Sequence, residues 1–263
     1  MKLNFALFPA FLACITTMLL ASTAQARPHG ARTNDATERS GSYENRFGNG
    51  TFSQNVNRSP GSANGSTTWT NANGSQGSHT FNNTWDSSTG TGTHQSSTTL
   101  ANGKTTSSQG TAAKTDNGYT YTGIATGPKG NTTDVSKTVT TSKGTRIADT
   151  TYTNPVTGKN STVDRMTTYA NGSKQISTTA ASPNGKTAIS NQDFTKSASG
   201  YSQTGTVTGP NGSVSTDNRN VSYIQNSDGT ITRTMTGSVT GPHGNTTPIG
   251  NSETYNKSYT PNN

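Results

Sequence analysis

Few side chains in this sequence are arranged for catalysis or for metal binding. None of the histidines is spaced with a second ligand as in a zinc site; they are His29, His79, His94 and His243. The 12 acidic residues are spread along the chain, which suits solvated or turn-stabilising carboxylates rather than a catalytic pair. The sequence contains no phosphate-binding loop, nucleophile elbow or calcium loop. We therefore expect a protein that is not an enzyme and that has no cofactor and no metal site.

The side chains best suited to binding are aromatic. Trp69, Trp85, Tyr121 and Tyr152 stand among threonine, serine and asparagine residues. An aromatic face can stack on a sugar ring, while nearby hydroxyl and amide groups bond to the hydroxyls of the sugar. These four residues are therefore candidates for glycan stacking. The alternative is that the same rings form the apolar core of the protein.

The charge of the chain gives a second indication about ligands. Lysine and arginine number 20 against 12 acids, for a formal net charge of +8. The basic residues are scattered singly, whereas nucleic-acid-binding proteins gather theirs into a patch. We expect a weak attraction to anionic surfaces or polysaccharides, and no nucleic-acid partner.

The first 26 residues are typical of a secretory signal peptide. A positive start is followed by an apolar stretch over residues 3–21, and Ala24 and Ala26 provide the small residues that a signal peptidase reads. Cys14 is the single cysteine, so its removal would leave a mature chain without thiols or disulfides. We predict secretion to the periplasm, cell surface or medium, with no transmembrane segment in the mature chain. A lipoprotein anchored through Cys14 is the alternative.

Composition divides the rest of the chain into three parts. Residues 27–62 hold scattered arginines among glycine, asparagine and serine without apolar periodicity, which predicts a disordered basic leader. Residues 63–250 alternate threonine with apolar or aromatic residues between Asn-Gly turns, which predicts a region of β-repeats built from hairpins. Residues 251–263 are predicted to form a polar C-terminal tail.

The repeat region has two superimposed periods. Turn glycines from Gly103 to Gly212 recur every 12 to 15 residues, so a step of about 14 residues holds one strand and one turn. Proline marks every second turn, and the first four of these prolines are 27 or 28 residues apart. The repeat unit is therefore a two-stranded hairpin of about 27 residues. The prolines that mark the repeat turns are Pro128, Pro155, Pro183, Pro210 and Pro242.

These periods predict an all-β fold made of an antiparallel hairpin meander. Hydrophobic residues make up only 25% of the chain, so a thick sandwich core is not expected. An elongated sheet or a stacked β-repeat array needs less apolar material, because each repeat covers the next. An open array would leave its edge strands exposed, which favours self-association through those edges.

The function predicted from these observations is structural. We expect a secreted bacterial repeat protein at the cell surface or in the extracellular matrix, acting in adhesion, in biofilm or as a self-assembling fibre. Uncharged strands rich in threonine, asparagine and serine can form hydrogen-bonded ladders between chains. The alternatives are a carbohydrate-binding module and a secreted effector without its own catalytic centre. A flat threonine array that binds ice is a further alternative, against which the irregular turn spacing argues.

Overall fold

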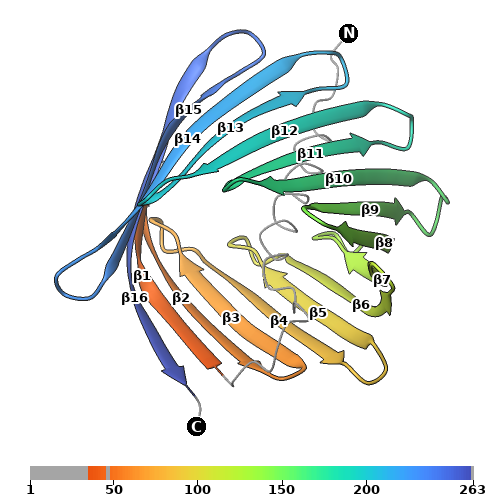
Figure 1. Cartoon of the computed structure of the whole chain (residues 1–263), viewed down its shortest axis with the longest axis horizontal. Coiled ribbons are helices and arrows are strands. Elements are labelled where there is room, and N and C mark those ends of the chain that lie inside the picture. The colour runs from red at the N-terminus through yellow and green to blue at the C-terminus, as the bar shows by residue number, and fades with distance from the viewer. Residues whose placement is uncertain (1–34, 46–47, 262–263) are drawn as a thin grey trace.

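The computed structural model describes residues 35–45 and 48–261, which form 16 β-strands. Each strand pairs antiparallel with its neighbours in the sequence, and β1 pairs with β16, so the sheet closes into a barrel (Figure 1). The strands are β1 (Asp35–Asn45), β2 (Gly48–Ser59), β3 (Ser62–Thr70), β4 (Gln76–Asp86), β5 (Thr91–Thr99), β6 (Thr105–Thr115), β7 (Gly118–Thr126), β8 (Thr132–Ser142), β9 (Thr145–Thr153), β10 (Asn160–Ala170), β11 (Ser173–Ala181), β12 (Thr187–Lys196), β13 (Gly200–Thr208), β14 (Val214–Gln225), β15 (Ile231–Thr240) and β16 (Thr246–Pro261).

The predicted all-β antiparallel meander is confirmed, but the predicted elongated sheet is wrong. The first and last strands pair from Asp35 with Pro261 to Glu44 with Ser252, which closes the meander on itself. Closure satisfies the backbone N–H and C=O groups that an open array would leave unpaired at its two edges. The free edges on which the predicted self-association depended are therefore absent from the described strands, and self-association itself stays a prediction.

The boundaries of the ordered region also differ from those predicted. β1 and β2 lie within residues 27–62, where composition predicts a disordered leader, and β16 extends into the predicted tail at 251–263. These strands carry few apolar residues, so their sequence shows little periodicity. They are held by backbone pairing on both sides, which closure of the ring provides. The predicted signal peptide and Cys14 lie outside the described residues.

The pairing register tilts the strands. Following paired residues once around the barrel shifts the register by about 20 residues, which for this strand number corresponds to a tilt of about 40°. Strands about 4.8 Å apart at this tilt would form a circular ring about 30 Å across, which is wider than side chains can fill. Contacts between strands are concentrated in hydrogen-bonded neighbours. The barrel therefore has an inner wall that a ligand could occupy.

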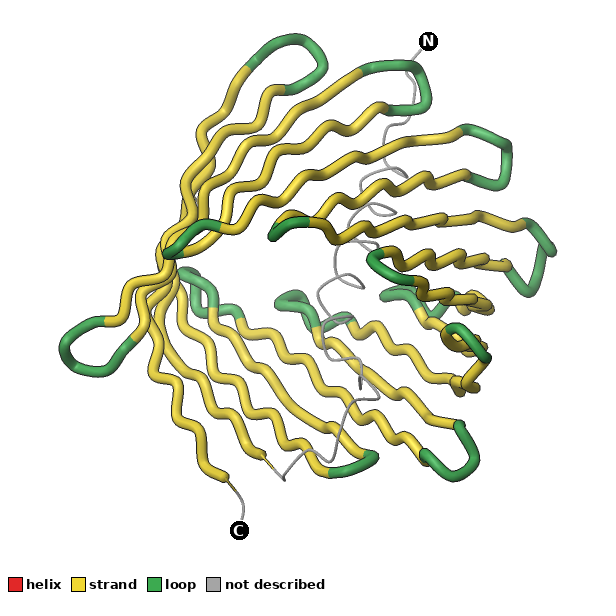
Figure 2. Tube along the Cα trace, in the orientation of Figure 1, coloured by secondary structure: helices red, strands yellow, loops and turns green. Residues whose placement is uncertain are grey.

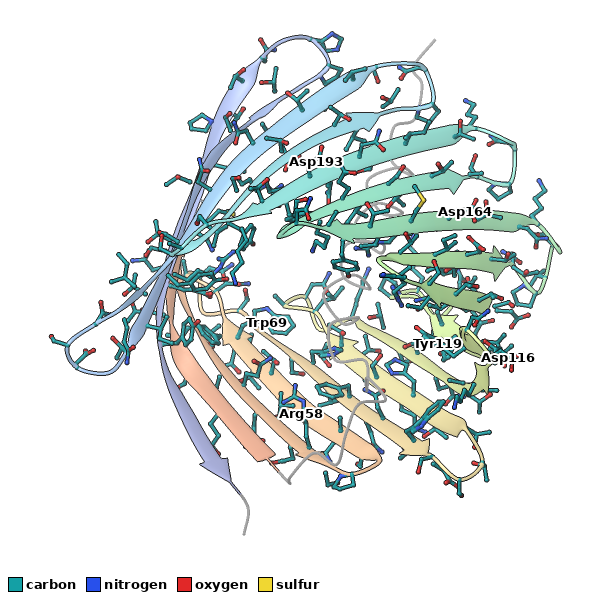
Figure 3. All side chains as sticks on the ribbon, in the orientation of Figure 1. Arg58, Trp69, Asp116, Tyr119, Asp164 and Asp193 are labelled. Carbon is teal, nitrogen blue, oxygen red and sulfur yellow. The ribbon has the colours of Figure 1, made fainter. Side chains whose placement is uncertain are left out.

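Alternate residues of each strand face inward and outward. On β8, Val135, Lys137 and Val139 are half-buried or buried, whereas Ser136 and Thr138 between them are exposed. Figure 3 shows Trp69 projecting toward the space that the strands enclose. The buried apolar residues all occupy inward positions, and they are Val56, Ala63, Val139, Ala148, Ile176, Val221 and Tyr255. The core is therefore a thin layer on the inner wall, and the outer face is mostly hydroxyl, amide and carboxylate groups.

Turns lie at the two ends of the strands (Figure 2). The structure places all five repeat prolines in turns that lead from an odd-numbered strand to the next even-numbered one. In the β7–β8 turn, Gly127 N donates to Asn131 O and Gly130 N donates to Gly127 O, both at 2.9 Å. Gly130 has a φ of 79°, which a residue with a side chain rarely adopts. Pro128 and Gly130 thus fix a tight turn with a bulge.

The repeat is visible in the register as well. β13 and β14 pair as β7 and β8 do, with Tyr119 opposite Val139 and Tyr201 opposite Val221. Both valines are buried. Over residues 35–45 and 48–261 there is no helix with the length and hydropathy of a membrane span.

Candidate ligand-binding site

The structure places the four predicted stacking residues on the inner wall, from β3 to β9. Trp85 and Tyr121 occupy one row of the wall, because the register connects them through one inward residue on β5 and one on β6. Tyr152 is one inward position from that row. Trp69 lies apart, since its cross-strand partner Gly77 is four inward positions along β4 from Trp85. The wall therefore gathers three of the four residues in one region.

Several of these rings lie against glycine backbone on a neighbouring strand. A Cβ atom added at Gly77 would overlap the indole of Trp69, and one added at Gly92 would lie 2.7 Å from Cε3 of Trp85. A Cβ at Gly110 would lie 2.6 Å from Cζ of Tyr121. In such a pair the aromatic ring covers the backbone of the glycine, and the contact fixes the position of the ring. Each of these rings thus has a structural role in addition to its inward position on the wall.

The inner wall also carries a group of cations that sequence reasoning missed. Lys137 on β8, Arg146 on β9, Arg165 on β10 and Lys174 on β11 all occupy inward positions, and we call them the cation cluster. Each was treated as one of many scattered basic residues. The alternation of side chains along each strand could have identified them, because the cations share the face of the inward apolar residues. The acids of the same strands occupy the alternate, outward positions. Those acids are Asp134, Asp149 and Asp164, and Asp193 on the next strand, β12, also faces outward.

The members of the cation cluster repel one another. Arg146 and Arg165 are diagonal neighbours, since Arg165 lies opposite Ala148. Burial lowers the pKa of Lys137 to about 8, with further lowering by Arg146 and Arg165. Burial and Arg146 lower the pKa of Arg165, and burial and Arg165 lower the pKa of Lys174. Positive charge is thus concentrated on this part of the wall at an electrostatic cost.

Hydrogen bonding around the cluster is incomplete. Nη2 of Arg146 donates to the hydroxyl of Tyr119 at 3.2 Å. Nε of Arg165 is buried and has no hydrogen-bond partner in the described part of the chain. A buried donor without a partner is rare in folded proteins, where such groups bond to protein, water or ligand. Arg165 therefore presents a donor that an acceptor group of a ligand could satisfy.

On β14 to β16, by contrast, inward cations of the wall are paired with inward acids. Asp217 Oδ2 lies 2.9 Å from Nε of Arg219, and Glu253 Oε1 lies 3.9 Å from Nη1 of Arg233. These two acids, on β14 and β16, are the inward-facing acids among the side chains that the structure describes. None of the acids on β8 to β12 faces inward. The cation cluster therefore differs from the β14–β16 part of the wall, because no acid on its own strands faces inward to balance it.

An open pocket of about 650 Å³ adjoins the cation cluster at the turn between β10 and β11. We call it the wall pocket, and its side chains include Tyr169, Lys174, Phe194, Lys196 and Tyr201. Nζ of Lys174 lies 4.0 Å from the centre of the Phe194 ring, and the Phe194 and Tyr201 rings are 6.1 Å apart. Tyr169 is 51% exposed. The pocket thus combines accessible aromatic faces with two ammonium groups, which suits a sugar ring that carries an acidic substituent.

The inward-facing histidines lie among polar side chains of the wall. Nδ1 of His94 bonds to Asn83 Oδ1 at 2.6 Å, and Nε2 of His94 bonds to Ser108 Oγ at 3.1 Å. Burial lowers the pKa of His79 and of His94. Across the described residues, no three side chains of His, Cys, Asp or Glu are grouped as metal ligands. The hydrogen bonds of His94 join β4, β5 and β6.

Comparison with family models, with curated proteins and with solved structures finds no match to this chain.

Proposed function

We propose that this protein is a secreted glycan-binding protein of the cell surface or extracellular matrix that catalyses no reaction on its ligand. The observation that carries the proposal is the shared position of aromatic rings, hydroxyls and amides on one inner wall. Trp85, Tyr121 and Tyr152 lie in one region of it, and the wall pocket adds three further rings. Stacking and multiple hydrogen bonds together are the means by which proteins hold sugars.

The adhesive or biofilm role predicted from composition fits within this proposal. A protein that holds matrix polysaccharide would act in adhesion without enzymatic chemistry. The outer face suits contact with water, because neighbouring strands carry outward hydroxyls there. Thr232 and Thr254 are examples, with Oγ1 atoms 3.0 Å apart. Assembly into fibres through strand edges has less support, because ring closure leaves the described strands without a free edge.

The proposal is tested by binding measurements with a panel of soluble polysaccharides. Both tryptophans of the protein lie on the inner wall, so ligand binding there should change their fluorescence. Tyr169→Ala removes an exposed ring from the wall pocket and should weaken binding about tenfold. Ile224→Ala is the control, since Ile224 is 58% exposed and faces outward. Absence of binding across neutral and acidic polysaccharides would overturn the proposal.

A further inference from the structure

The chemical class of the ligand follows from the charge of the inner wall. We propose that the wall over β8–β12 binds an acidic polysaccharide, with Lys137, Arg165 and Lys174 contacting its carboxylate or sulfate groups. The aromatic rings of the wall pocket would stack on the sugars of the same chain. This inference rests on the proposed glycan-binding function and specifies which glycans are bound.

The first argument is the segregation of charge across the sheet. Inward cations and outward acids alternate on β8, β9 and β10, as with Lys137 and Asp134 on β8. The two charges face opposite sides of the sheet, so an acid of these strands cannot pair with the cation cluster across the wall. The opposite arrangement is present on β14, where Asp217 and Arg219 face inward together and form an ion pair. An anionic ligand would supply the missing negative charge.

The second argument is that the basic groups are buried without a compensating negative charge or a full set of hydrogen bonds. Burial and like-charge repulsion both disfavour the charged form of Lys137, and the buried Nε of Arg165 has no acceptor in the described chain. A carboxylate or sulfate placed between them would accept hydrogen bonds from Arg165 and reduce the repulsion. The same anion would benefit from the low polarity that raises the cost of the empty cluster. Binding of an anion would thus also reduce the repulsion among the buried cations.

The third argument is continuity between the cation cluster and the aromatic surface. Lys174 belongs to the cation cluster and also lines the wall pocket, where its Nζ lies over Phe194. In the other direction, Tyr121 lies directly opposite Lys137 on the neighbouring strand. A chain-like ligand could therefore place acidic groups on the cations and sugar faces on the rings at both ends of the cluster. This repeated alternation is the chemistry of a polymer of acidic sugars rather than of a free anion.

An acidic polysaccharide fits better than a nucleic acid. Inward positions next to the cations hold hydroxyl and amide groups, which match sugar hydroxyls: Thr150 lies opposite Lys137, Thr167 lies opposite Arg146, and Gln192 is on the adjoining strand β12. A single-stranded nucleic acid would present a phosphate at every nucleotide and would call for a groove of cations along its whole length. Here the cation cluster occupies neighbouring strands β8–β11 and adjoins the rim of the wall pocket, rather than following a groove of cations.

The experiment compares two forms of one polymer with the full secreted chain. Polygalacturonate carries a carboxylate on each sugar, and its fully methyl-esterified form has the same backbone without the charge. We expect the wild-type protein to bind polygalacturonate at least tenfold more tightly than the ester at low salt, where charges are least screened. Arg165→Met should weaken polygalacturonate binding about tenfold and leave binding of the ester unchanged. Lys129→Met is the matched control, because Lys129 lies exposed in the β7–β8 turn.

A second readout requires no variant in the cluster. At pH 8 an anion near Lys137 should draw up to about half a proton onto its amine, which calorimetry in buffers of different ionisation enthalpy measures. The other titratable groups that face Lys137 are Tyr121, Arg146, Tyr152 and Arg165. Absence of proton uptake during tight binding would remove Lys137 from the site. Lys174→Met provides a further variant should Arg165→Met fail to fold.

The outcomes separate this inference from the proposed function. Equal affinity for the acid and the ester, unaffected by Arg165→Met, would overturn the acidic ligand while leaving glycan binding in place. Failure to bind either polymer or any other polysaccharide would overturn both. Binding of a 20-residue oligothymidylate more tightly than polygalacturonate, with loss in Arg165→Met, would replace the inference by a nucleic-acid site.

Discussion

Replacing Lys137 by methionine removes one charge from the cation cluster and keeps a side chain of similar length. The pKa of Lys137 is lowered from 10.5 to about 8 in the folded protein, first by burial and then by Arg146 and Arg165. A shift of this size corresponds to a cost of about 3 kcal/mol for holding the amine protonated in the fold. Methionine carries no such cost and retains most of the aliphatic contacts. We expect Lys137→Met to stabilise the unliganded protein by about 1–3 kcal/mol at pH 7.

The pH dependence has a defined sign. The folded-state pKa of about 8 lies below the ordinary value of 10.5, so the unfolded chain binds the proton more tightly. The destabilisation is fully present below pH 8 and disappears as the pH rises through 10.5. The advantage of Lys137→Met over the wild type should therefore shrink by about 2 kcal/mol between pH 7 and pH 9.5. The other ionisable groups are present in both proteins, so their contributions to the pH dependence largely cancel in the difference.

The assay is urea unfolding followed by tryptophan fluorescence at the two pH values. Lys129→Met serves as the control, since it removes an exposed lysine from the β7–β8 turn and should change the free energy of unfolding by less than about 0.5 kcal/mol. Added sulfate should stabilise the wild type more than Lys137→Met, because only the wild type retains the full cation cluster. A variant that is less stable than the wild type at pH 7, or whose advantage is the same at both pH values, would refute the electrostatic reasoning.

Three further predictions concern the wall and the outer face. Gly77→Ala should destabilise the protein by about 1–3 kcal/mol in urea unfolding, because the new methyl group overlaps an indole, whereas the methyl group of Gly127→Ala would lie at an ordinary contact distance, 3.7 Å from the backbone oxygen of Asn131, and should be nearly neutral. Burial lowers the pKa of His94 from 6.5, so the melting temperature should fall as the pH drops below 6.5, and His94→Gln should reduce that slope. Asp149 and Asp164 lie directly opposite each other on the outer face, so Asp164→Asn should raise the free energy of unfolding by about 0.5 kcal/mol at low salt.

Each of these has a result that would contradict it. Equal stability of Gly77→Ala and Gly127→Ala would mean that the indole of Trp69 does not rest on β4. A melting temperature that rises on acidification from pH 7 to pH 5, or a slope unchanged by His94→Gln, would contradict the assignment of His94 to the buried wall. Loss of stability in Asp164→Asn would show that this carboxylate is stabilised by a contact that outweighs its repulsion.

The local structure of this protein could be predicted from its sequence because the signals are local. Glycine at a left-handed position and proline in front of it fix a turn wherever they occur, as Pro128 and Gly130 do. Alternation of threonine with larger residues gives strands with two distinct faces, and Tyr119 and Tyr121 share one face as their spacing predicts. The inward position of the candidate stacking residues is a consequence of the same alternation.

Ring closure could not be predicted in this way. Pairing of β1 with β16 joins residues at opposite ends of the described chain, and it depends on the accumulated twist and register of every hairpin between them. The residues that form it are polar and carry little periodic pattern, so residues 35–59 looked like a disordered leader. Backbone hydrogen bonds, which every sequence can offer, hold these strands in place.

The cation cluster illustrates the division between sequence and tertiary structure. The sequence alone determined the strands and turns of the repeat region, and the alternation that places Lys137, Arg146 and Arg165 on one face and their acidic neighbours on the other. Only the tertiary structure decided that this face is the inside of a closed wall, where burial and mutual repulsion turn scattered cations into a concentrated positive surface. The physical reason is that charge and burial depend on distances between strands, and those distances are set by closure of the ring rather than by any single repeat.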